Sequence, residues 1–132
     1  MRAPFRPSAP GSGMLPVHAL LVVCIAVEAV LQLADLGLLG PARLRGLAYE
    51  YGAFWPGLLD GWQPNYPAQP WAMFASYAFL HGGLMHLAFN MITLFSLGRA
   101  VTERLGPWRF ALLYAATAMG GAGVYAFLSQ SG

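Results

Sequence analysis

The sequence predicts an all-α protein embedded in a membrane, with three transmembrane helices. The 132 residues are 58% hydrophobic and only 9% charged, whereas a soluble domain carries about 25% charged residues. A chain this short buries only a modest fraction of its surface in its own core, so this much apolar surface suits a lipid environment. The apolar residues also form three runs, each long enough for a bilayer crossing of about 20 residues.

The first segment, residues 1–13, is rich in Pro, Ser, Gly and Ala and predicts a flexible tail. An apolar run at 15–35 follows, with Pro16 in the first helical turn, where a missing N–H costs little. A signal peptide is the competing interpretation, because a basic start precedes the run. The run exceeds the usual signal-peptide core of about 7 to 15 residues and lacks a good cleavage site, so a membrane span is favoured.

Residues 40–70 form a connector rich in proline and aromatic residues. Its prolines exclude a continuous helix, and they are Pro41, Pro56, Pro64, Pro67 and Pro70. Its aromatic side chains are Tyr49, Tyr51, Phe54, Trp55, Trp62 and Tyr66. Tyrosine and tryptophan favour the headgroup layer, so we expect this loop to lie in or on the membrane surface.

The second predicted span covers residues 71–98 as one helix, which is longer than a bilayer core and should tilt or project. A short link at 99–106 leads to the third span at 107–128, which Pro107 opens. Small residues four apart, which allow close helix contact in lipid, mark the third span. They are Ala116 with Gly120, and Ala118 with Ala122.

The arginines predict the orientation of the chain. Five lie before the first span or between the second and third, and only two lie in the connector. The five are Arg2, Arg6, Arg99, Arg104 and Arg109. The positive-inside rule then places the N-terminus in the cytoplasm and the aromatic connector outside. The seven arginines and five acidic residues are too scattered for a nucleic-acid interface, so we expect no nucleic-acid partner.

Three polar side chains in the second span, His81, His86 and Asn90, are the strongest candidates for function. Polar groups inside a membrane are costly and default to a functional hypothesis. His86 and Asn90 are four residues apart and share a helix face, while His81 on the same helix would lie about 140° away from His86. Their N–H donors could stabilise the oxyanion formed when a nucleophile attacks a peptide carbonyl.

Other roles for this cluster fit less well. A helical zinc motif places its histidines four apart with a Glu between them, whereas here the spacing is five with no Glu, and Asn is a poor zinc ligand. Axial haem ligation by one histidine and a purely structural role between helices remain alternatives. Because the spacing and the residue types fit metal ligation poorly, we expect no metal and no cofactor.

The sequence offers no nucleophile and base for these donors. The six serines are Ser8, Ser12, Ser76, Ser96, Ser129 and Ser131, and none lies in a G-x-S-G turn. The remaining histidine, His18, is predicted at the cytoplasmic end of the first span. Near the other end of that span, Glu28, Gln32 and Asp35 suggest interfacial solvation, with Glu28 deep enough to face a helix neighbour. Cys24 suggests a small packing residue.

The pattern His81-x4-His86-x3-Asn90, followed by Gly98-x7-Gly106 and an aromatic, Gly-rich third span, resembles the rhomboid intramembrane proteases. The resemblance runs from about Ala78 to Gly132. It implies that residues 14–132 are part of a rhomboid-like membrane domain, and that the three spans correspond to the first half of a six-helix bundle.

The resemblance also implies roles for the site. In rhomboids a Ser in a G-x-S-G turn on the fourth helix attacks the substrate, a His on the sixth helix activates it, and a His and an Asn on the second helix line the oxyanion hole. By position His86 and Asn90 take the oxyanion role, and His81 is a supporting residue. The implied function is a serine endopeptidase that cleaves membrane-anchored proteins. Its partners would be the lipid bilayer and transmembrane protein substrates.

Two departures from the family pattern matter. Many rhomboids carry Glu four residues after the glycine matched to Gly98, where this chain has Thr102, with Glu103 one residue later. The serine nucleophile and the histidine base are also absent from these 132 residues, so we expect the chain alone to be inactive. A fragment, a truncated gene and a short paralogue that binds transmembrane clients are the remaining interpretations. The arginine distribution favours a bacterial inner membrane.

Overall fold

The structure is a computed structural model that describes residues 13–130, with the Gln130 side chain excluded, and this part of the chain contains helices and no strand. The elements in order are α1 (Leu15–Asp35), α2 (Leu44–Gly52), the 3-10 turn η1 (Pro56–Leu59), α3 (Gln69–Ser76), the 3-10 turn η2 (Tyr77–Phe79), α4 (Leu84–Leu105) and α5 (Pro107–Gln130). The expected flexibility of the 1–13 tail concerns residues that, apart from Gly13, lie outside the described part.

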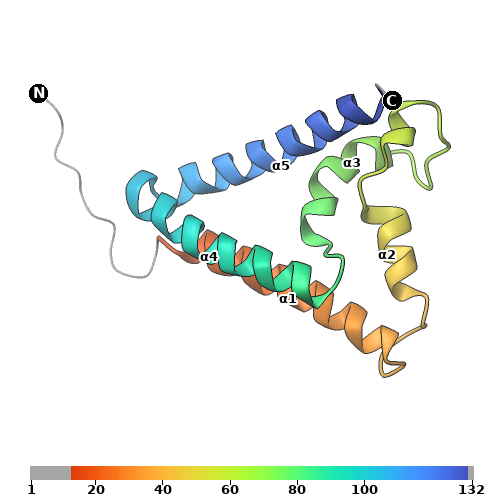
Figure 1. Cartoon of the computed structure of the whole chain (residues 1–132), viewed down its shortest axis with the longest axis horizontal. Helices are drawn as coiled ribbons and strands as arrows, with labels where there is room; N and C mark the ends of the chain where they lie inside the picture. Colours follow the sequence, from red (N-terminus) through yellow and green to blue (C-terminus); the bar gives the residue numbers. More distant parts are fainter. Residues whose placement is uncertain (1–12, 131–132) are drawn as a thin grey trace, which may run out of the picture.

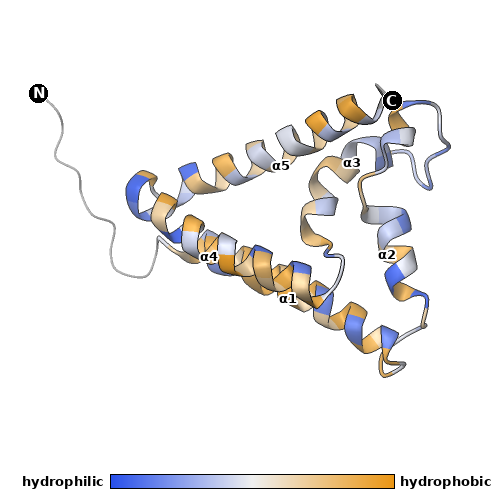
Figure 2. Cartoon of the chain, viewed as in Figure 1, coloured by the Kyte–Doolittle hydropathy of each residue, from blue (hydrophilic) through white to orange (hydrophobic). Residues whose placement is uncertain are grey.

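Three helices are long and apolar enough to cross a membrane: Leu15–Asp35, Leu84–Leu105 and Pro107–Ser129. The predicted all-α class with three such helices is confirmed. In Figure 1, α1 and α4 lie side by side, α5 diverges from the end of α4, and α2 and α3 occupy the wide end of the resulting wedge. Figure 2 shows that hydrophobic residues dominate the three long helices, whereas hydrophilic residues mark the α4–α5 turn and α2.

The prediction of one continuous helix over 71–98 is wrong. The chain forms α3, then η2, then an extended residue at Leu80 with φ −99° and ψ 136°, and α4 begins only at Leu84. Gly83 caps α4 with φ +120°, a backbone conformation open to glycine and incompatible with an α-helix. The Gly82-Gly83 pair therefore ends one helical segment and starts another.

The predicted link at 99–106 is also mostly helical. The α4 helix continues to Leu105, where Arg99 and Glu103, one turn apart, form an ion pair of 2.7 Å. Only Gly106, with φ +87°, departs from helical geometry before Pro107 begins α5. A single glycine thus makes the turn between two long helices.

The connector, predicted as a loop over residues 40–70, is partly helical. It contains α2 and η1, and α3 begins at Gln69, just before the predicted end of the connector. Phe54 fixes the connector to the rest of the fold. Its ring contacts those of Phe74, Tyr77 and Tyr125, at centroid distances of 4.9, 5.9 and 6.1 Å. The connector is therefore packed onto α3 and onto the C-terminal half of α5.

The long helices meet through small residues. A Cβ built on Gly98 of α4 would lie 3.0 Å from Val17 of α1 and 3.2 Å from Phe110 of α5, so the three helices approach closely there. On α5, Ala122 is buried and Ala118 half-buried, whereas the other predicted small pair, Ala116 and Gly120, is exposed. Cys24 is buried, as expected for a packing residue.

Candidate active site

The first turn of α4 holds His86 in a defined state. Gly83 is the residue before the helix, and the N–H of Gly82 donates a hydrogen bond to Nδ1 of His86 at 3.1 Å. Since Nδ1 accepts this bond, the neutral imidazole carries its proton on Nε2. His86 therefore presents an N–H donor on the far side of its ring.

His81 lies beside His86, though the two do not share a helix. Because His81 precedes the break, the predicted angle of about 140° around one helix does not apply. The two rings meet edge to face with centroids 5.4 Å apart. His81 is only 3% exposed, and its Nδ1 has no hydrogen-bond partner among residues 13–130. Burial, and secondly the neighbouring His86, lower the pKa of His81 below the usual 6.5, which favours the neutral ring.

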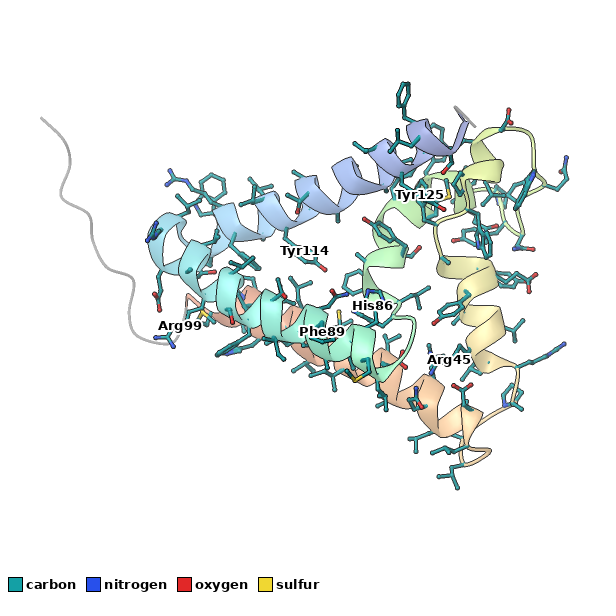
Figure 3. All side chains as sticks on the ribbon, viewed as in Figure 1. Arg45, His86, Phe89, Arg99, Tyr114 and Tyr125 are labelled. Atoms are coloured by element: carbon teal, nitrogen blue, oxygen red, sulfur yellow. The ribbon has the colours of Figure 1, made fainter. Side chains whose placement is uncertain are left out.

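Asn90 follows His86 by one helical turn and lines a cavity of about 490 Å³ between α4 and α5. Figure 3 shows His86 on the side of α4 that faces α3, and Tyr114 reaching from α5 toward the space between α4 and α5. The cavity wall is largely apolar, and its polar side chains include Asn90, Thr93, Tyr114 and Thr117. An amide donor thus lies in the wall of a largely apolar cavity.

One side chain bridges this cavity. The hydroxyl of Tyr77, from η2, donates to the carbonyl oxygen of Ala118 on α5 at 2.7 Å. Tyr77 also lines the cavity. The short segment between α3 and α4 therefore contacts α5 as well as carrying the residues next to His81.

A polar network behind the site was missed by the sequence analysis. Glu28 of α1 is fully buried and accepts two hydrogen bonds from Arg45 of α2, at 3.0 and 3.2 Å. Gln32 donates to the same carboxylate at 2.9 Å, and Asp35 accepts from Arg45 at 2.6 Å. Interfacial solvation is therefore wrong for Glu28, which does face a neighbouring helix. The Glu28 carboxylate raises the pKa of Arg45, so the guanidinium stays charged.

The network reaches the site through Tyr49. Arg45 donates to the Tyr49 hydroxyl at 3.4 Å, and that hydroxyl donates to the carbonyl oxygen of His81 at 2.5 Å. In the sequence, this network is indicated only by an arginine in the connector and by acidic residues near the end of the first span. That pattern does not identify which acidic residue pairs with the arginine.

The structure also locates the departure from the rhomboid pattern at the end of α4. Thr102 points inward and is 5% exposed, and its hydroxyl has no partner within the described part of the chain. Glu103 is exposed and pairs with Arg99. Glu103 therefore does not occupy the inward position at which many family members carry a glutamate.

Among residues 13–130, no serine hydroxyl is hydrogen-bonded to a histidine. Ser76 donates to the carbonyl of Gly52 at 2.7 Å, and Ser129 to that of Tyr125 at 2.8 Å, so both bond to the backbone. The described residues also contain no group of three or more His, Cys, Asp or Glu side chains placed to hold a metal ion.

Comparison with known proteins identifies relatives of this chain. The Rhomboid domain model matches residues 67–132, which is half of the chain. Rhomboid protease GlpG from two strains of Klebsiella pneumoniae is 32% identical over 102 residues, which cover 76% of this chain and 31% of each relative. The chain thus spans about a third of the length of these relatives. No solved structure matches it significantly.

The matched segment contains the break before α4, His81, His86, Asn90 and the whole of α5. The three long apolar helices make the chain a multi-pass membrane protein. On the family match and this helical architecture, the protein belongs to the rhomboid family.

Proposed function

We propose that this chain carries the oxyanion-stabilising part of a rhomboid-type intramembrane serine endopeptidase that cleaves membrane-anchored proteins. The observation that supports this most is the state of His86. Its Nδ1 is engaged by Gly82, so Nε2–H is available as a donor on the helix face that also carries Asn90. Kinship to a named rhomboid protease over 102 residues agrees with that activity.

In this mechanism the two side chains act where negative charge develops. When a serine attacks the scissile peptide, the carbonyl oxygen becomes an oxyanion, and Nε2–H of His86 and the amide N–H of Asn90 donate to it. Fixed donors in a site with little water are worth more than in bulk water, because they are already oriented. His81, edge-on to His86, restricts rotation of the imidazole. The serine and its histidine base come, in this proposal, from chain that continues beyond Gly132.

The proposed location is a bacterial inner membrane, with the N-terminus in the cytoplasm. The charged α4–α5 turn carries Arg99, Arg104 and Arg109 and lies at the opposite end of the long helices from the aromatic connector. Cytoplasmic segments carry an excess of arginine and lysine, which supports this orientation. The site then opens toward the outer side.

The first test is to read the coding DNA beyond the Gly132 codon and to assay the encoded protein in liposomes with a transmembrane substrate. We expect an in-frame G-x-S-G and a later histidine. In that protein His86→Ala or Asn90→Ala should each slow cleavage about 100- to 1000-fold, the usual cost of one oxyanion donor. His18→Ala, a histidine stacked on Phe95 instead, should cleave normally. Unchanged cleavage in both site variants would contradict the oxyanion role.

Binding of transmembrane clients without cleavage is a second candidate. The largely apolar cavity of about 490 Å³ between α4 and α5 favours it. If a genuine stop codon follows Gly132, this candidate takes the lead. It predicts that a double substitution of His86 and Asn90 leaves co-purification of a transmembrane client unchanged.

A further inference from the structure

The peptide group between His81 and Gly82 is held at both of its edges. Its carbonyl oxygen, from His81, accepts a hydrogen bond from the Tyr49 hydroxyl at 2.5 Å. Its N–H, from Gly82, donates to Nδ1 of His86 at 3.1 Å. No cis peptide occurs in the described chain, so the C=O and N–H of this rigid plane point in opposite directions. Tyr49 and His86 are therefore connected through a single planar unit.

Arg45 fixes the direction in which the Tyr49 hydroxyl proton points. Arg45, one turn earlier on α2, lies with its guanidinium 3.4 Å from the Tyr49 oxygen. A guanidinium can only donate, so the tyrosine oxygen accepts and its own proton is free for the His81 carbonyl. Arg45 in turn is anchored by the buried carboxylate of Glu28 on α1 and by Asp35. Arg45 thus links the position of the Tyr49 hydroxyl to the first membrane helix, α1.

Without this anchor the peptide plane would have little reason to keep its orientation. Gly82 and Gly83 lack side chains, so the plane can rotate with little steric cost. A rotated plane would turn the His81 carbonyl toward His86. A carbonyl accepts only, so Nδ1 would then have to carry the proton and Nε2 would lose it. The orientation of one peptide therefore decides which nitrogen of His86 is the donor.

We propose that Tyr49 is a positioning residue that, through the His81–Gly82 peptide, holds His86 in its Nε2–H tautomer. The catalytic meaning of this tautomer rests on the proposed function, but the tautomer itself does not. The Glu28–Arg45 pair acts one step further back, by orienting the Tyr49 hydroxyl. The connector thereby acts on a hydrogen-bond donor of α4 through one peptide group.

The test is the tautomeric state of His86 in the full chain, labelled with 15N-histidine and held in detergent micelles at mildly alkaline pH. Two-bond 1H–15N spectra distinguish the two ring nitrogens, and His81→Gln, His86→Gln and His18→Gln assign the three histidines. We expect a single Nε2–H form in the wild type and a mixture in Tyr49→Phe, which removes only the hydroxyl. Tyr51→Phe, on the same helix with its ring stacked on Tyr66, should keep the wild-type pattern.

The proposal is overturned by an Nδ1–H form in the wild type, or by an unchanged Nε2–H form in Tyr49→Phe. Should Tyr49→Phe fail to fold, the link between the His81–Gly82 peptide and His86 is still tested on the wild type. A scalar coupling across the N–H···N bond from Gly82 to His86 is expected, and its absence in folded wild type contradicts the connection. The Gly82 amide of Tyr49→Phe should also exchange about 5- to 10-fold faster, as for loss of one hydrogen bond.

Cleavage rates alone would be a poor test. An equal mixture of tautomers leaves half of the molecules competent, so kcat should fall only about twofold with KM unchanged. The two proposals also fail separately. If His86→Ala cleaves normally, the oxyanion role is lost whatever the spectra show. If Tyr49→Phe leaves the His86 tautomer unchanged while His86→Ala is inactive, only the positioning role of Tyr49 is contradicted.

Discussion

Gly83 is the residue on which the start of α4, and so the placement of His86, depends. Its φ of +120° with ψ of 175° lies in a region that residues with a Cβ almost never occupy. No atom lies within 4 Å of a Cβ built at this position, so space does not restrict it. The requirement for glycine is therefore a matter of backbone conformation alone.

Gly83→Ala should consequently destabilise the fold by about 1–3 kcal/mol through backbone strain. The neighbouring Gly82→Ala is a matched control, since its Cβ would meet His86 Nδ1 at an ordinary 3.5 Å and its φ is not positive. We expect that variant to lose less than about 1 kcal/mol. Unfolding of both variants by SDS titration measures the difference. Equal losses would show that the conformation of Gly83 is not what limits this position.

His81 predicts a pH dependence of stability. Its pKa is lowered in the fold, so above pH 6.5 the ring is neutral in both folded and unfolded chains and stability is complete. As the pH falls below 6.5 the unfolded chain takes up a proton that the folded chain resists, so stability falls by up to about 1.4 kcal/mol per pH unit until the folded pKa is reached. Unfolding followed across this range should show less slope in His81→Gln than in wild type.

At the scale of single residues, the sequence singles out His81, His86 and Asn90 as candidates, because polar groups stand out in an apolar run, and their roles stay a prediction. It was not sufficient for Glu28 and Arg45. These two lie 17 residues apart on different helices, and no local pattern reports which acid meets which base. The role of Tyr49 depends on the same long-range packing, and so could only come from the structure.

At the scale of elements, the three apolar helices were predictable because length and hydropathy decide them. The break inside 71–98 was not located, since a run of apolar residues says nothing about where its backbone leaves the helix. The glycine pair at 82 and 83 lowers the helix propensity there, but propensity alone is a weak signal. The helix α2 was hidden by the prolines on either side of it, which exclude one long helix without excluding a short one.

The crossing of α1, α4 and α5 depends on Gly98. Gly98→Ala would bring a Cβ within 3.0 Å of Val17 and 3.2 Å of Phe110, which should cost about 1–3 kcal/mol as the helices move apart. Gly123→Ala on α5 is the control, because nothing lies within 4 Å of its added Cβ. That variant should be neutral or slightly stabilised. Thermal stability in detergent compares the two, and a neutral Gly98→Ala would argue against tight packing here.

At the scale of the whole molecule, the proposed orientation can be tested by labelling. In a Cys24→Ala background, a membrane-impermeant thiol reagent should modify Asp60→Cys in the connector on intact cells. It should reach Arg104→Cys, at the α4–α5 turn, only after permeabilisation. Both positions are exposed, so access differs only by side of the membrane. The reverse pattern would invert the topology and place the site toward the cytoplasm.

The contact between Tyr77 and α5 has a mechanical consequence. The helices α4 and α5 form the two legs of a letter A with its apex at Gly106, and the Tyr77 hydroxyl, 2.7 Å from the carbonyl of Ala118, is the crossbar. Packing at Gly98 holds the legs close together near the apex, and farther out the Tyr77 hydroxyl adds a hydrogen bond between η2 and α5. Whatever enters the space between the legs must therefore work against this hydrogen bond as well as against the helix packing.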